Sequence, residues 1–197
     1  MTEVADRYWV ASGGFLARIQ ATPADRWNAP SPCAGWTAQD VVAHVINGHR
    51  GILAVVNGTR PVPADGVGVS AMAGAPTVSP GADVAVAFQR CRQDMHAMLS
   101  DPDRAATRLP GGPLGPVPAG HAADVIGIME LLVHTWDLAR AIGGDERLAP
   151  ELVARTHLAL LPHYANLQAT GAFAPSIPAP GNADPQAAFL YFTGRRP

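Results

Sequence analysis

The chain has 197 residues, of which 48% are hydrophobic and 15% charged, a composition typical of a packed globular domain rather than a disordered segment. Its formal net charge of -2, with 14 basic residues that are all arginine, argues against a nucleic-acid-binding surface and excludes a phosphate loop or a Schiff base built on lysine. No apolar run is long enough to span a bilayer, and no signal peptide is evident. Two cysteines are too few for a disulfide scaffold. We therefore expect one cytoplasmic domain over residues 1–197.

The first half of the chain contains two strong helix patterns. Apolar residues recur at helical spacing over residues 3–20 and predict a first amphipathic helix. After a stretch rich in turn formers, Thr37 with Asp40 three residues later is typical of a helix N-cap. We predict that a second helix begins there and ends near residue 57.

The rest of the chain is predicted to form a long loop followed by further helices. Residues 59–81 have no sustained period and are predicted to form a long loop. Further helices are expected over residues 82–99 and 119–142, and after the Asp184–Pro185 start signal. Another helix is expected to begin at Pro150 and to carry His157 and His163. Four substantial helices with long connections and no predicted strand indicate an all-α helical bundle, in which ligand sites form between facing helices.

The fourth predicted helix places three polar side chains on one stripe. At about 100° per residue, Glu130, His134 and Asp137 share this stripe with small residues, whereas the opposite side of the helix is apolar. A solvent-exposed face more often carries scattered Arg, Glu and Gln side chains. Small neighbours beside a carboxylate and an imidazole leave room for a ligand, so this stripe is a candidate binding site.

His44 lies on the second predicted helix among apolar neighbours. If the second and fourth helices pack together, His44, Glu130 and His134 supply two imidazoles and one carboxylate. Such a set can hold zinc through three protein ligands and leave one coordination position open, as catalytic zinc sites do. The same ligands suit Fe(II), and Asp137, near His134, could orient a ligand by a hydrogen bond.

Simpler interpretations of these residue types stay open. Glu130 and His134 could form a surface pair, which contributes little stability. Cys33 is interpreted as a small packing residue ahead of the second helix. The alternative is that the N-terminus of that helix gives Cys33 thiolate character. A buried histidine is more often a hydrogen-bonded core residue than a ligand, and the histidines given that interpretation are His49, His96, His121, His157 and His163. The aromatic residues assigned to the core are Trp9, Trp27, Trp36, Trp136 and Phe189.

Three separated segments resemble one protein family. They read WNAPSPCAGWTAQDVVAHVINGHRG, LGPVPAGHAADVIGIMELLVHTWDLARAIG and NADPQAAFLYFTGRRP. They are similar to segments of the DinB-like metal-binding proteins of actinobacteria, and more closely to the metal-binding domain of mycothiol-dependent maleylpyruvate isomerase. The resemblance implies a four-helix bundle in up-down-down-up order, here with extra C-terminal helices.

The family resemblance also implies a site and a chemistry. Carried over residue by residue, the metal ligands fall on His44, Glu130 and His134, and the usual metal is zinc. The family pattern implies that a low-molecular-weight thiol of the mycothiol type binds the metal as thiolate and attacks a small electrophile. The protein is an isomerase if the thiol leaves again after the double bond has rotated, and a transferase if the adduct is the product. Arg50 and Arg140 are candidates for binding a substrate carboxylate.

Other functions remain open at this stage. The isomerase carries a further domain after the bundle and this sequence stops at Pro197, so we do not expect maleylpyruvate itself as the substrate. The same ligands would also suit a metal-dependent hydrolase or an iron oxygenase. A third alternative is a non-catalytic, metal-stabilised bundle that binds a ligand. Apolar faces on the outer helices would allow two chains to pair as a homodimer.

Overall fold

The structure is a computed structural model that describes residues 2–71, 74–169 and 174–197. Within these ranges the regular elements are helices, and β-pairing is confined to isolated bridges. The prediction of an all-α fold is therefore confirmed. Among the described residues, no helix has the length and hydropathy needed to cross a membrane.

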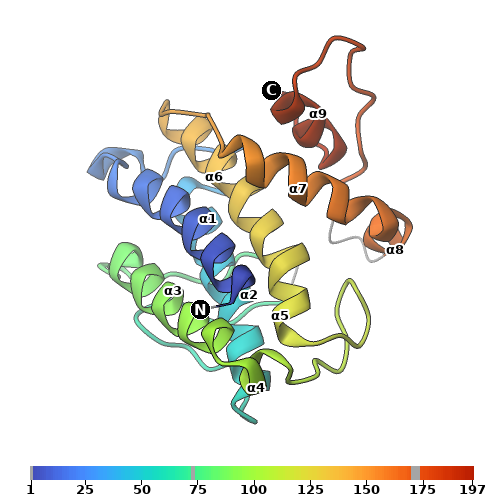
Figure 1. Cartoon of the computed structure of the whole chain (residues 1–197). Coiled ribbons are helices and arrows are strands. Elements are labelled where there is room, and N and C mark those ends of the chain that lie inside the picture. Colours follow the sequence, from blue (N-terminus) through green and yellow to red (C-terminus); the bar gives the residue numbers. More distant parts are fainter. Residues whose placement is uncertain (1, 72–73, 170–173) are drawn as a thin grey trace.

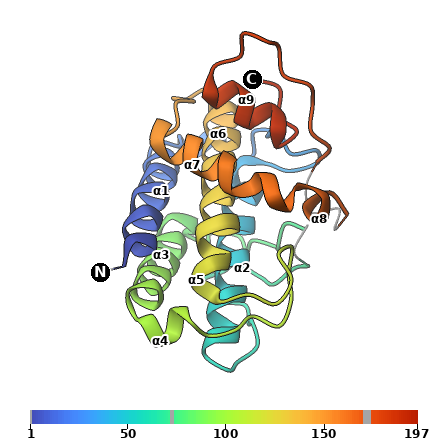
Figure 2. The ribbon, with the colours of Figure 1, turned by 45° about the vertical axis from the view of Figure 1, so that its right-hand side comes forward.

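Four long helices surround the core. They are α1 (Glu3–Gln20), α2 (Ala38–Val56), α3 (Val84–Ser100) and α6 (Ile128–Ile142). Each of α1 and α2 packs against both α3 and α6, so the four helices form a closed ring (Figure 1). In Figure 2, α1 and α6 run upward while α2 and α3 run downward, as in the order that the resemblance implies. The long connection between α2 and α3 allows these two helices to run in the same direction.

The fourth predicted helix contains an irregular turn. It begins as α5 (Ala119–Ala122), passes through the π-helical stretch η2 (Ala123–Gly127), and continues as α6. A π-helical turn inserts an additional residue, so a regular helical wheel does not hold across η2. Glu130 and His134 follow this turn, on the regular part of the helix.

Shorter elements flank the bundle. The 3-10 turn η1 (Ala24–Arg26) precedes α2, and α4 (Pro102–Ala105) follows α3 at the lower end of the molecule in Figure 1. The predicted start of the third helix at residue 82 is two residues early, because the Asp83 side chain caps the helix by accepting from Ala85 and Val86 N–H groups. Asp83 is the N-cap and lies outside the helix.

The C-terminal helices form an additional layer. They are α7 (Pro150–Leu160), the 3-10 turn η3 (Leu161–His163), α8 (Tyr164–Ala169) and α9 (Pro185–Phe192). The predicted fifth helix is interrupted at η3, where Pro162 provides no backbone N–H. α7 packs on α6 and α9, which brings the C-terminal tail back to the bundle.

The core assignment of the large aromatic residues is only partly right. Trp136 and Phe189 are fully buried. Trp27 and Trp36 are half-buried, and Trp9 is 40% exposed. Trp9 lies at the surface because its ring covers the Arg92 guanidinium, whose central carbon is 3.3 Å from the ring centroid.

Apolar side chains remain on the outer surface of the C-terminal layer. Leu158 is 69% exposed and Leu161 is 51% exposed. Isolated exposed leucines are common on monomers, so they do not identify an interface. The homodimer stays a prediction.

The start of α2 gives a stability prediction. Thr37 Oγ1 accepts from the Asp40 N–H at 3.2 Å, and Asp40 Oδ2 accepts from the Thr37 N–H at 2.8 Å. We expect Thr37→Ala to lower the free energy of unfolding by about 1 kcal/mol, because the Asp40 N–H loses its acceptor, Thr37 Oγ1, while the Thr37 N–H keeps its bond to Asp40. Urea denaturation measures this, with the exposed Thr59→Ala as the control. Equal effects of the two substitutions would contradict the capping role.

Candidate metal centre

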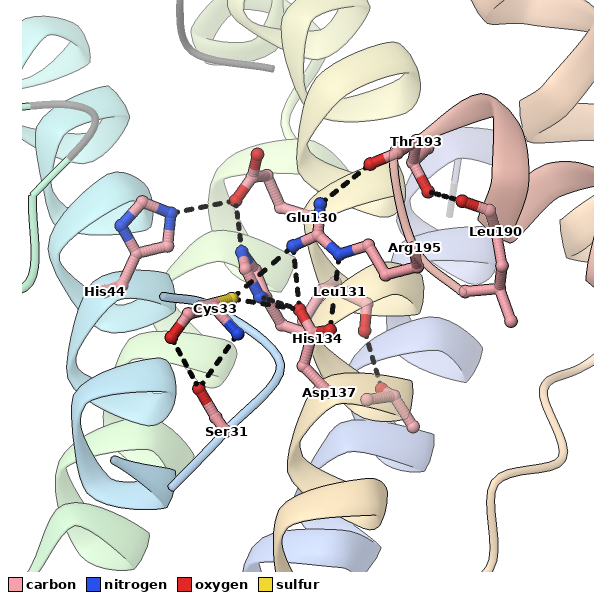
Figure 3. Close-up of polar contacts among 11 residues, drawn as sticks. Ser31, Cys33, His44, Glu130, Leu131, His134, Asp137, Leu190, Thr193 and Arg195 are labelled. Carbon is pink, nitrogen blue, oxygen red and sulfur yellow. Dashed lines mark hydrogen bonds and ion pairs between the residues drawn. The ribbon is translucent and has the colours of Figure 1, made fainter. Parts of the chain in front are cut away.

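The three residues predicted as metal ligands meet between two helices. His44 lies on α2, and Glu130 and His134 lie on α6. Glu130 Oε2 is 3.0 Å from His44 Nε2 and 3.0 Å from His134 Nε2. One ligand atom from each residue lies within 4.8 Å of the other two. Figure 3 shows both imidazoles pointing at the Glu130 carboxylate.

The far side of each imidazole is held by an acceptor. His44 Nδ1 is 3.3 Å from the Gly74 carbonyl oxygen, and His134 Nδ1 is 2.9 Å from Asp137 Oδ2. A carbonyl and an ionised carboxylate accept only, so each Nδ1 carries a hydrogen. Because the hydrogen of each imidazole is on Nδ1, the two Nε2 atoms present lone pairs to the negatively charged Glu130 carboxylate. A cation between them, either a proton or a metal ion, removes this repulsion.

These side chains fit a divalent metal. Ligand atoms placed about 2.0–2.1 Å from a tetrahedral zinc lie about 3.3 Å apart, close to the two 3.0 Å separations around Glu130 Oε2. A metal-binding histidine commonly donates its other ring N–H to a carboxylate or a backbone carbonyl, which fixes the ring. His44 and His134 both meet that condition.

The electrostatics favour a cation at the same place. Burial alone would raise the pKa of Glu130, but hydrogen bonds from His134 and His44 outweigh it and hold that pKa well below its ordinary range. Burial opposes a charged His134, yet the hydrogen bonds to Asp137, Cys33 and Glu130 raise its pKa well above the ordinary value. The centre therefore keeps its carboxylate ionised at neutral pH and attracts a positive charge.

Asp137 supports His134 from a fully buried position. Its side chain is 0% exposed, and it contacts Arg195 from the C-terminal tail in addition to His134. Arg195 Nη2 lies 2.8 Å from Oδ2 and Arg195 Nε 3.2 Å from Oδ1. Burial would raise the pKa of Asp137, but the His134 hydrogen bond and the Arg195 charge lower it to about 2.

Cys33 packs against the edge of the core, as the sequence predicted, but it also has polar partners that the sequence did not indicate. Its Sγ donates to Asp137 Oδ2 at 3.3 Å, and Arg195 Nη2 lies 3.5 Å from the same sulfur. Cys33 and Arg195 were missed because they are far from α6 in sequence. They lie in the first and third segments of the family resemblance, but spacing alone cannot bring them to one carboxylate.

A large cavity adjoins the centre. Its volume is about 1300 Å³, and the residues along its wall include His44, Glu130 and His134. Most of the lining is apolar and comes from α2, α6, residues 109–117 and the tail. The ring of Trp36, which also lines the cavity, lies 4.8 Å from that of His44 and is stacked 6.3 Å from that of His134.

The two arginines proposed for substrate binding lie in different places. Arg140 lines the cavity, but its guanidinium pairs with Glu146 at 2.6 Å and stacks over the Trp136 ring. Arg50 is not part of the cavity wall and pairs with Asp65 at 2.8 Å. The structure therefore brings Arg140, and not Arg50, to the cavity beside the centre.

The expectation that the other histidines are hydrogen-bonded core residues is right for His49 and wrong for the other four. His49 is buried, its Nδ1 lies 3.4 Å from the Tyr8 hydroxyl, and its Nε2 has no hydrogen-bond partner among the described residues. Burial lowers the pKa of His49 to about 4. The remaining four are partly or fully exposed, and they are His96, His121, His157 and His163.

Comparisons with known proteins identify one family. Residues 9–139 match the family described as the mycothiol maleylpyruvate isomerase N-terminal domain. Two uncharacterized proteins of Mycobacterium tuberculosis, from strains CDC 1551 / Oshkosh and ATCC 25618 / H37Rv, are each 30% identical over 190 residues, covering 94% of this chain and 93% of the relative. No solved structure matches significantly.

Proposed function

The chain belongs to the family of mycothiol maleylpyruvate isomerase N-terminal domains, and from that premise we propose a metal- and thiol-dependent transferase or isomerase. Its metal is a divalent cation, with zinc as the first candidate. Its thiol is of low molecular weight and of the mycothiol type, and its second substrate is a small electrophile. His44, Glu130 and His134 are the proposed ligands.

One observation carries this proposal. Three protein ligand atoms converge on the wall of a large cavity, and three protein ligands leave one tetrahedral position for an exogenous group. Bound there, zinc would lower the pKa of a thiol in that position, so that the thiolate forms at neutral pH. A purely structural zinc site would more often be closed by a fourth protein ligand.

The residues of the chain have distinct parts in this chemistry. His44 and His134 would hold the metal through Nε2 and Glu130 would hold it through Oε2, while Asp137 accepts from His134 Nδ1 and fixes the orientation of the ring. The Trp36 ring covers both imidazoles and limits the access of water to them. Orientation and water exclusion together favour attack by a bound thiolate.

The cavity is large enough for two substrates. Pockets for a single drug-sized ligand span about 300–1,000 Å³, whereas this cavity measures about 1300 Å³. A thiol and an electrophile can therefore occupy it together, with the apolar walls covering the carbon skeleton of the electrophile. Arg140 is the proposed partner for a substrate carboxylate and would exchange part of its pairing with Glu146.

The test is a thiol screen with zinc-loaded protein. Mycothiol and other low-molecular-weight thiols are combined with small electrophiles, and adduct or isomer formation is followed by mass spectrometry. We expect thiol-dependent turnover that Glu130→Gln abolishes, because the site loses its only proposed carboxylate ligand. Glu151→Gln, which alters an exposed carboxylate on α7 away from the cavity wall, is the matched control and should remain active.

Other outcomes favour the alternative functions. Turnover that needs the metal but no thiol would replace this proposal with a hydrolase, or with an oxygenase if the bound metal were Fe(II). A metal-loaded protein without turnover, whose metal has no exchangeable water, would identify a non-catalytic, metal-stabilised ligand-binding bundle.

A further inference from the structure

Arg195 reaches the candidate centre from the end of the chain. Its guanidinium contacts both oxygens of Asp137, at 3.2 Å from Nε to Oδ1 and 2.8 Å from Nη2 to Oδ2. In Figure 3 it lies between the short segment after α9 and the helix that carries His134. Its side chain is largely buried, with 16% of its surface exposed.

We infer that Arg195 is a positioning residue for the metal centre and that the C-terminal tail completes this centre through Asp137. This inference rests on the metal site of the proposed function and not on its thiol chemistry. The chain of contacts runs from Arg195 to Asp137 to His134 Nδ1, and His134 Nε2 then faces Glu130.

The two-point contact decides the orientation of the Asp137 carboxylate. One oxygen, Oδ2, accepts from His134, Arg195 and Cys33, while Oδ1 accepts from Arg195 Nε. A carboxylate held at both oxygens by a planar guanidinium has a single orientation. Without Arg195 the carboxylate could rotate away from the imidazole, and His134 would lose the acceptor that fixes its ring.

The charge of Arg195 is needed as well. Asp137 has no exposed surface, and an ionised carboxylate in such a place requires a compensating cation. Among the described residues, its ion-pair partners are His134 and Arg195. If a neutral His134 binds a metal, Arg195 is the one full positive charge among the described residues that pairs with Asp137.

The path of the tail holds Arg195 in place. The Arg195 N–H donates to the Leu190 carbonyl at 2.8 Å, and Arg195 Nη1 donates to the Thr193 carbonyl at 2.9 Å. Gly194 has a φ of 79°, and a Cβ at this position would lie 2.6 Å from the Ala174 Cβ. Only glycine fits this turn without displacing the tail and, with it, the Arg195 guanidinium.

Metal affinity measures the inference directly. Zinc dissociation constants are determined with a competing chelator for wild type, Arg195→Met and the matched control Arg196→Met. Arg196 is the exposed neighbouring arginine. We expect Arg195→Met to weaken zinc binding by about 10- to 100-fold, the usual cost of losing support for a ligand, and Arg196→Met to leave it unchanged.

Two further variants separate positioning from loss of a side chain. Arg195→Lys keeps the charge but cannot contact both carboxylate oxygens, so its affinity should lie between those of Arg195→Met and wild type. Gly194→Ala leaves Arg195 in the sequence but displaces it, and it should also weaken zinc binding. Circular dichroism of the metal-free proteins verifies that each variant is folded.

A measurement on the wild-type protein needs no variant. If tail docking strengthens metal binding, metal binding must strengthen tail docking by the same factor. Zinc should therefore slow amide hydrogen exchange in residues 190–196, where the Arg195 N–H is bonded to the Leu190 carbonyl. The Arg196→Met protein should show the same slowing.

Three results would overturn the inference. These are wild-type zinc affinity in folded Arg195→Met, no effect of zinc on exchange in the tail, and a wild-type protein that binds no metal. Zinc binding that depends on Arg195, in a protein without thiol-dependent turnover, would support the inference and reject only the proposed function.

Discussion

The His44→Ala protein is expected to keep the helical circular dichroism spectrum of wild type and to bind no zinc, whereas wild type binds about one equivalent. His44 contributes the only proposed ligand from α2, while Glu130 and His134 both come from α6. Its loss leaves two ligands on one helix, which is fewer than the three protein ligands of a catalytic zinc site. Elemental analysis of untagged protein measures the difference.

The fold should survive this substitution. The His44 side chain faces the cavity and the Trp36 ring, and the packed positions around it on α2, such as Val42 and Ile46, are unchanged. His96→Ala is the matched control because His96 is partly exposed on α3 and contacts Trp9 instead of the centre. Equal metal content in wild type and His44→Ala would reject the site, and negligible metal in both would reject the catalytic function.

Acid is expected to destabilise the metal-free protein through His49. Burial lowers the pKa of His49 to about 4, whereas its ordinary value is 6.5. Between these pH values the unfolded chain binds a proton that the folded protein does not bind, so the stability falls as the pH falls from 6.5 to 4. His49 contributes about 3 kcal/mol to this loss, which is complete below pH 4.

The variant His49→Gln isolates this contribution. Chemical denaturation of the chelator-treated proteins at pH 7 and pH 4 gives the loss of stability on acidification for each protein. We expect the loss to be smaller by about 3 kcal/mol in His49→Gln than in wild type, because glutamine does not titrate. His121→Gln, which removes an exposed histidine, should behave like wild type. An unchanged loss in His49→Gln would show that His49 is not buried as a neutral group.

The helices were predictable because their signals are local. The Thr37–Asp40 cap and the start at Asp184–Pro185 depend on hydrogen bonds within three residues, and both occur in the structure. The break at Pro162 carried a local signal too, but the sequence interpretation continued the helix across it. The π-helical stretch before α6 has no comparable signal, because it depends on how the whole helix packs in the bundle.

Part of the candidate site was likewise predictable from the sequence, and part was not. By itself, the sequence determined the helices, their apolar faces and the stripe that carries Glu130, His134 and Asp137, since residues four or seven apart on one helix must share a face. Only the tertiary structure decided that His44 faces this stripe, that Arg50 lies elsewhere, and that Cys33 and Arg195 meet at Asp137. Those contacts depend on how helices and tail pack together, and no local periodicity encodes that packing.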